Sequence, residues 1–165
     1  MASRPQRDPA TSWKWTLPVA LALAALAAGT TWWVNAQGFT LLYGDAQAHL
    51  NIARRVLDSR TPGVMQIGTV WLPLPHLLMM PLAGCDALWD NGLAGAIPAS
   101  ACYWLGTLFF FLALSRVFRS PWAGIAGAWA MALNPNLLFL QATPMTEAIF
   151  IAAIGGILYG CVRYG

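Results

Sequence analysis

The sequence is short of charged residues and of cysteines, and each shortage excludes a class of protein. Only 9% of its 165 residues are charged and 58% are hydrophobic, which lies outside the composition of soluble domains. The net charge of +3 is too small for the basic surface typical of nucleic-acid binding, so we expect no nucleic-acid partner. The three cysteines are odd in number and lie far apart, so they indicate neither a disulfide framework nor a zinc site. The composition therefore predicts an integral membrane protein.

Four long apolar runs predict an all-α membrane domain over residues 16–165 with about four transmembrane helices. Each run is about long enough, at 1.5 Å per residue, to cross a hydrocarbon core of roughly 30 Å. In the third run Pro135 removes a backbone donor and disfavours the helical region for Asn134, so we expect that helix to end or kink there. The predicted spans are residues 16–34, 95–115, 120–140 and 145–162.

The first run has two interpretations. Tryptophans at both of its ends fit the interfacial anchors of a retained transmembrane helix that follows a polar tail, residues 1–15. A cleaved signal peptide also fits, because a basic flank precedes the apolar core and small residues follow it. The retained helix is favoured because the apolar run continues past the small residues to Val34.

The positions of the basic residues predict the orientation of the chain. Arg116 and Arg119 lie in a short turn between two spans, and Arg163 follows the last span. Since cytoplasmic loops carry an excess of Lys and Arg, both termini are expected in the cytoplasm. Residues 35–94 then form a large outer loop.

The outer loop contains an amphipathic helix, expected over residues 45–58. Asp45 and His49 are four residues apart and fall on the same arc as the apolar residues of this helix, so both are expected to be buried. Asp45 is then either an N-cap that accepts from the amide of Gln47 or Ala48, or a general base or metal ligand that His49 assists. Both interpretations stay open.

The three arginines of the loop, Arg54, Arg55 and Arg60, also have two interpretations. They can hold an interfacial helix to lipid head groups, or they can bind the phosphate of a lipid-linked substrate. The apolar segment between Val70 and Trp89 contains three prolines and is short for a span, so a re-entrant or interfacial segment is expected. His76 within it is expected to be a packed polar residue and not a ligand.

Glu147, the only glutamate of the chain, lies at the outer end of the last span. It is expected in the first helical turn, with Thr143 as N-cap and Pro144 at the first helical position. The predicted orientation places it on the same side of the membrane as Asp45. The two carboxylates are therefore candidate ligands of a divalent cation, or a site for an acceptor.

Three segments together resemble the N-terminal portion of C-type membrane glycosyltransferases. The closest similarity is to the branch of protein O-mannosyltransferases and aminoarabinose transferases. These enzymes pair an acidic residue in the first external loop with a proline-rich segment after it. The three segments are "YGDAQAHLNIARRVLDSRTPG", "TVWLPLPHLLMMPLA" and "ALNPNLLFLQATPMTEAIF".

The resemblance implies transfer of a sugar from a polyprenyl-phosphate donor at the outer face of a bacterial inner membrane. Asp45 matches the acid of the first loop, which takes or orients the acceptor's proton. Glu147 matches the acid of the second loop, which in some branches holds a divalent metal, and His49 occupies a position where relatives have an aromatic residue or a histidine. The single acid in "GDAQAH" and the separated prolines in "WLPLPH" depart from the pattern and leave metal dependence and acceptor class open.

The length of the chain supports a rival hypothesis. Members of the family have more spans, so this chain is expected to act as part of a longer or complemented protein, or as a non-catalytic subunit that contacts other membrane subunits. Small residues on the last two spans would allow such contacts. A small transporter is a weaker third hypothesis, because the spans lack the ionisable residues that mark a translocation path.

Overall fold

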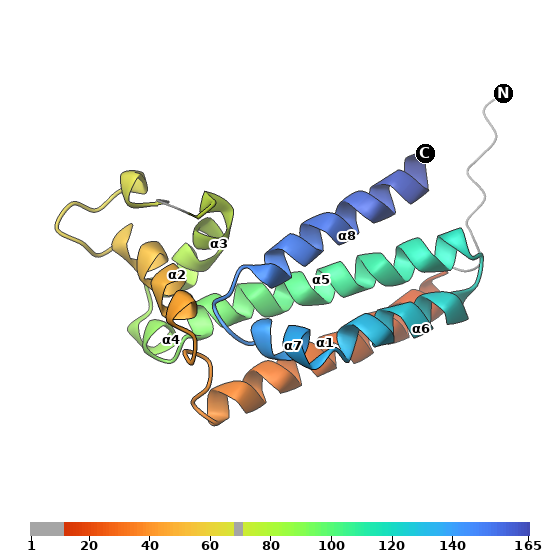
Figure 1. Ribbon diagram of the computed structural model, residues 1–165, viewed down its shortest axis with the longest axis horizontal. Coiled ribbons are helices and arrows are strands. Elements are labelled where there is room, and N and C mark those ends of the chain that lie inside the picture. The colour runs from red at the N-terminus through yellow and green to blue at the C-terminus, as the bar shows by residue number, and fades with distance from the viewer. Residues whose placement is uncertain (1–11, 68–70) are drawn as a thin grey trace.

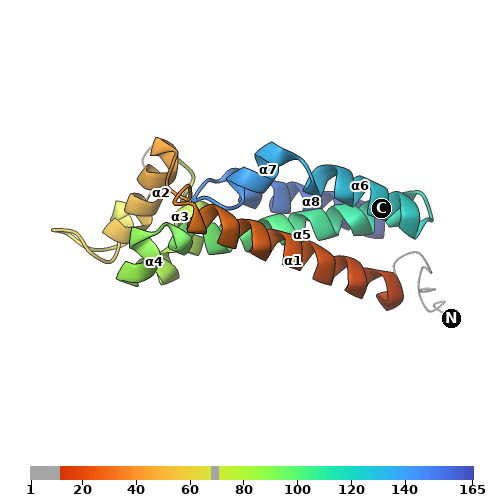
Figure 2. The same ribbon diagram turned by 90° about the horizontal axis from the view of Figure 1, so that it is seen from below.

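The computed structural model describes residues 12–67 and 71–165, and all regular secondary structure in them is helical. Long helices lie side by side in one part of the molecule, and shorter helices gather at one end of them (Figures 1 and 2). We call the long part the bundle; it comprises α1 (Trp13–Ala36) and α5 (Leu93–Val117) together with α6 (Pro121–Ala132), α7 (Pro135–Leu140) and α8 (Glu147–Tyr164). We call the other part the cap; it comprises α2 (Gly44–Arg55), η2 (Val64–Gln66), α3 (Pro73–Ala83) and α4 (Asp86–Asp90).

Three helices of the bundle, α1, α5 and α8, are long and apolar enough to cross a membrane. They confirm the helices expected for the first, second and fourth apolar runs, with ends shifted by two or three residues. α5 lies at the centre and packs against α1, α6 and α8, while its first turns contact the cap. The chain is therefore an all-α protein of the integral membrane class.

The third predicted span is two helices instead of one. α6 ends at Ala132, and Asn134 caps α7, because its side chain accepts from the amides of Asn136 and Leu137. Pro135 occupies the first turn of α7. The predicted break at Pro135 is confirmed. With 12 residues, α6 is about 18 Å long and does not match a hydrocarbon core by itself.

Close packing in the bundle depends on small residues and on a few buried hydrogen bonds. A side chain at Gly124 of α6 would collide with the backbone oxygen of Phe111 on α5. Tyr103 donates from its hydroxyl to the carbonyl of Ala132 at 2.6 Å, which joins α5 to the end of α6. Trp104 donates from its indole nitrogen to the carbonyl of Ala20 at 2.9 Å, which joins α5 to α1.

The cap is held to the bundle by a second, smaller apolar cluster. Leu50 and Ala53 on α2 pack with Met79 and Ala83 on α3, and all four are at most 2% exposed. The predicted amphipathic helix over 45–58 is thus confirmed over Gly44–Arg55. The segment expected to be re-entrant or interfacial contains α3, which packs on α2 and α5, and its position relative to a membrane stays a prediction.

The two ends of the described chain lie at the same end of the bundle, opposite the cap (Figure 1). α1 runs toward the cap and α5 runs away from it. α6, α7 and the following turn lead back, and α8 runs away again. Of the predicted tail 1–15, residues 1–11 lie outside the described residues, and α1 already begins at Trp13. The cap is formed almost entirely by the predicted outer loop, 35–94.

Candidate functional site

Two histidines meet between α2 and α3 of the cap. Nδ1 of His49 and Nε2 of His76 are 3.0 Å apart, which is hydrogen-bond distance. Both side chains are buried, with 2% and 0% exposure. The indole of Trp71, just before α3, packs against the His49 ring with centroids 4.6 Å apart. The expectation that His76 is a packed polar residue is confirmed, and the structure adds that its partner is His49.

Burial lowers the pKa of both imidazoles below the ordinary histidine value, so both are neutral in the folded cap at neutral pH. Asp45 and Glu147 act in the opposite direction and raise the pKa of His49. His49 and Arg55 lower the pKa of His76 further, while the backbone of Leu72 raises it. The two acids thus raise the pKa of His49, and the arginine lowers the pKa of His76.

Asp45 lies in the first turn of α2 but is not its N-cap. The helix begins one residue earlier than expected, so Tyr43 takes the cap position and no side chain caps the helix. Asp45 is exposed, which contradicts its predicted burial, because the first turn buries Ala46 instead. Its carboxylate makes no hydrogen bond within the described residues, so it is free to meet a ligand.

Glu147 begins α8, as an acid in the first turn, but its predicted cap is wrong. Thr146 precedes the helix, whereas Thr143 donates from its hydroxyl to the carbonyl of Leu140 at 2.7 Å and belongs to the turn after α7. Pro144 is buried in the turn and lies against Gly95 of α5. Oε2 of Glu147 is enclosed and has no hydrogen-bond partner within the described residues.

The structure brings Asp45, His49 and Glu147 from two different parts of the chain to one end of the bundle. Both carboxylates are close enough to raise the pKa of His49. The described residues contain no cluster of three histidine, cysteine or acidic side chains that could hold a metal ion. The predicted cation ligands Asp45 and Glu147 belong to no such cluster, and metal binding by these two residues stays a prediction.

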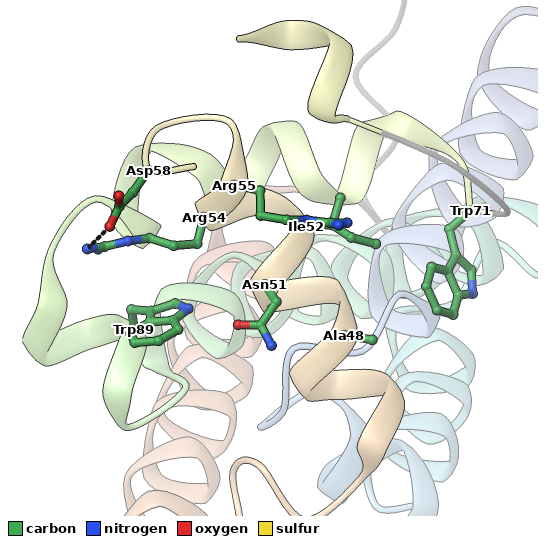
Figure 3. Close-up of a pocket in the computed structure, with 8 residues that line it drawn as sticks. All are labelled: Ala48, Asn51, Ile52, Arg54, Arg55, Asp58, Trp71 and Trp89. Atoms are coloured by element: carbon green, nitrogen blue, oxygen red, sulfur yellow. Dashed lines mark hydrogen bonds and ion pairs between the residues drawn. The ribbon is translucent and has the colours of Figure 1, made fainter. Parts of the chain in front are cut away.

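A hollow of about 730 Å³ opens beside the histidines, on the exposed side of α2 (Figure 3). Two tryptophans, Trp71 and Trp89, stand on opposite sides of it. The indole of Trp71 both lines the hollow and contacts the ring of His49, so this one side chain separates the hollow from the histidine. The hollow is lined by Ala48, Asn51, Ile52, Arg54, Arg55, Asp58, Trp71 and Trp89.

The three predicted phosphate-binding arginines have different surroundings. Arg54 is held in place: it contacts Asp86 at 2.6 Å and Asp58 at 3.3 Å, and it donates to the carbonyl of Ala83 at 2.8 Å. Its guanidinium also lies 5.3 Å from the centre of the Trp89 ring. The hydrogen bond to Asp86 raises its pKa most, and Asp58 raises it further.

Arg55 and Arg60 are exposed and make no ion pair in the part of the chain that the structure describes. Arg55 lines the hollow and points away from Arg54, toward the side of Trp71 (Figure 3). Arg60 does not line the hollow. The hollow thus has one arginine that is already paired and one that is free for an anion.

Three residues of this region, Trp71, Trp89 and Asp86, were not predicted from the sequence, and neither was the pairing of His76 with His49. Their partners are distant in sequence, so helical periodicity within α2 gives no signal for them. One signal was available for the histidine pair, since the chain contains only two histidines and both lie in the predicted outer loop.

Comparison of the chain with models of known protein families, with characterised proteins and with solved structures finds no match. The site must therefore be interpreted from its own residues.

Proposed function

We propose that this chain forms the N-terminal part of a membrane glycosyltransferase that takes a sugar from a polyprenyl-phosphate donor. The observation that carries the proposal is the shared position of Trp71. Its indole lines the hollow that Arg55 also lines, and it packs against His49. The charges of Asp45 and Glu147 raise the pKa of His49. An anion site and an acid–base cluster are thus separated by a single side chain.

The chemistry of sugar transfer needs both parts. A phosphate leaving group requires a cationic partner, and the guanidinium of Arg55 provides one at an exposed position. The acceptor hydroxyl requires a group that takes its proton, and the exposed Asp45 with His49 beside it provides that group. The new bond joins the acceptor oxygen to the anomeric carbon. The bond from that carbon to the phosphate oxygen breaks, and polyprenyl phosphate leaves with the electron pair.

The orientation that we propose has four crossings, both termini in the cytoplasm and the cap outside a bacterial inner membrane. The position of both described ends at one end of the bundle supports an even number of crossings, with α6 and α7 together forming the third. The outer position of the cap would place the hollow beside the head groups of membrane lipids. A lipid-linked sugar donor could then enter with its chain still in the bilayer.

A divalent cation is a further part of the proposal, with Asp45 and Glu147 as the residues that would hold it. Mg²⁺ is commonly bound by one or two carboxylates together with substrate phosphates, so two acids can suffice only when the donor is present. A cation would supply charge stabilisation to the phosphate. We therefore expect chelation to weaken donor binding.

The test is sugar transfer by the chain in its longest natural reading frame, with Asp45→Asn as the variant. A positioned base contributes about 10²- to 10⁴-fold, so a loss in that range is expected. Asp90→Asn is the matched control, because Asp90 is another exposed acid of the cap that does not act on His49. Transfer by Asp45→Asn at the wild-type rate would exclude the assigned role of Asp45.

A second candidate function, a non-catalytic subunit in a larger membrane complex, is favoured by α8. This helix packs mainly on α5, and only 17% of its 18 residues are buried. Phe150 and Ile157 on its open side are 66% and 68% exposed. Stoichiometric purification with partner subunits, without binding of polyprenyl phosphate, would favour this function over the enzyme.

A further inference from the structure

The charged side chains of the described residues separate the two ends of the molecule. Four aspartates lie between the start of α2 and the end of α4, and Glu147 begins α8 at the end of the bundle that faces the cap (Figure 1). At the opposite end, α1 and α6 begin and α5 and α8 end. The charged side chains described there are all basic: Lys14, Arg116, Arg119 and Arg163.

Three of these cations belong to one surface, which we call the basic end: Lys14, Arg116 and Arg119. The indole of Trp15 on α1 packs edge-to-face against that of Trp122 on α6, with ring centroids 5.2 Å apart. Lys14 directly precedes Trp15, and Arg119 lies in the turn that leads into α6. Both views show the start of α1 and this turn at the same end of the bundle (Figures 1 and 2).

Arg119 occupies a position that usually belongs to glycine. The amide of Ser120 donates to the carbonyl of Ser115 at 3.0 Å, and the amide of Arg119 donates to the carbonyl of Arg116 at 3.3 Å, so α5 ends in a Schellman motif. The motif requires a left-handed residue, and Arg119 has a φ of 49°, the one positive value among the non-glycine residues that the structure describes. A Cβ atom makes this conformation costly, so glycine would suit the turn better. The arginine is therefore explained by its side chain and not by the turn.

Exposed apolar side chains lie around the basic end. Phe118 and Trp122 are 63% and 66% exposed, and Trp13 at the start of α1 is 70% exposed. Trp32, near the other end of α1, is 72% exposed, and the helix rises about 29 Å between Trp13 and Trp32 at 1.5 Å per residue. This rise matches a hydrocarbon core of roughly 30 Å, and tryptophan is enriched at both of its surfaces. The basic end therefore lies at the level of lipid head groups.

We infer that the basic end is a binding surface for anionic phospholipids. Arg116 and Arg119 contact the phosphate of the head group, for which the arginine fork is suited, and Phe118 and Trp122 lie beside the acyl chains. This agrees with the proposed orientation, because the cytoplasmic leaflet carries anionic lipids. The surface lies at the opposite end of the molecule from the hollow, so it is distinct from the proposed donor site and does not depend on sugar transfer.

The test is phospholipid binding by the full chain in a neutral detergent. Phosphatidylglycerol is titrated in, with zwitterionic phosphatidylcholine as the reference, and bound lipid is counted by native mass spectrometry. One basic residue at an anionic membrane surface changes affinity by about fivefold, so Arg119→Gly should weaken phosphatidylglycerol binding about fivefold. Arg116→Gln combined with Arg119→Gly should weaken it about 25-fold. Arg60→Gln is the matched control, because it removes an exposed arginine at the cap end, and its binding should stay near wild type.

Thermal unfolding separates lipid binding from a structural role of the same arginine. Without added lipid, Arg119→Gly should unfold at the wild-type temperature or higher, because glycine relieves the left-handed backbone. Phosphatidylglycerol should then raise the unfolding temperature of wild type more than that of Arg119→Gly. Equal lipid binding by these two proteins, or an equal loss in Arg60→Gln, would overturn the inference. Equal stabilisation of wild type by inorganic phosphate would also overturn it, because that result indicates a site for a free anion and not a lipid surface.

Discussion

The bundle and the cap bury their side chains in different ways. In the bundle, buried positions are mostly small or apolar, and buried polar groups such as Tyr103 donate to the backbone of a neighbouring helix. In the cap, burial includes two histidines that bond to each other and to no other side chain. Arg54 joins α2 to α3 and α4 through a carbonyl and a carboxylate. The bundle is thus built for packing, whereas the cap contains buried groups that can change charge.

The largest effect on stability is expected where the bundle is tightest. Gly124→Ala places a carbon against the carbonyl of Phe111 and the hydroxyl of Ser115, so α5 and α6 must separate. Overpacking of this kind costs about 1–3 kcal/mol in the free energy of unfolding, measured by denaturant titration in detergent. Gly160→Ala is the control, because no atom lies within 4 Å of the added carbon. Equal stability of the two variants would contradict the tight contact between α5 and α6.

The bundle was the part that the sequence could predict. A long apolar run has few alternatives to a helix, and Pro135 marks its break by local chemistry alone. The ends of α1, α5 and α8 agree with the apolar runs to within two or three residues. The cap was predicted only as far as local pattern reaches. α2 was expected from its amphipathic period, but the pairing of His49 with His76 depends on how α3 folds back over α2.

The candidate site was therefore predicted by residue type and not by contact. Asp45 and Glu147 stood out as acids near the outer ends of apolar segments, and the structure brings both into range of His49. The three arginines were equivalent in the sequence, because nothing in it shows that Asp86 forms an ion pair with Arg54 and that Arg55 has no such partner among the described residues. Sequence distance hides such pairings, and only the fold separates a paired arginine from an open one.

The second effect concerns the cap alone and depends on pH. Both histidines have pKa values lowered by burial, so the unfolded cap binds protons more readily than the folded cap. The stability that their neutral forms give is complete above the ordinary pKa of 6.5 and is lost as the pH falls through the lower folded values. The protection factors of the α2 and α3 amides in hydrogen exchange should therefore fall below about pH 6.5, while those of the α5 amides do not. An equal fall in α5 would contradict the separation of bundle and cap.

The smallest effect is expected for Arg54→Gln. Its ion-pair partners Asp58 and Asp86 are mostly exposed, with 73% and 76% of their side-chain surface open to solvent. Exposed ion pairs contribute little and are screened by salt. A slight destabilisation of the cap is expected at low salt, read from exchange of the α4 amides, and it should shrink at high salt. A large loss that salt leaves unchanged would show that the carbonyl contact to Ala83 matters more than the charges.

We propose that the cap, and not the bundle, carries a site for a lipid-linked phosphate. The most direct measurement is equilibrium binding of polyprenyl phosphate to the full chain in detergent, compared between Arg55→Gln and Arg60→Gln. Both residues are exposed arginines of the predicted outer loop, but only Arg55 lines the hollow. A charge-assisted hydrogen bond is worth about 1.5–3 kcal/mol, so Arg55→Gln should weaken binding by roughly tenfold or more, and Arg60→Gln should leave it near wild type. No saturable binding, or equal weakening by both variants, would contradict the account.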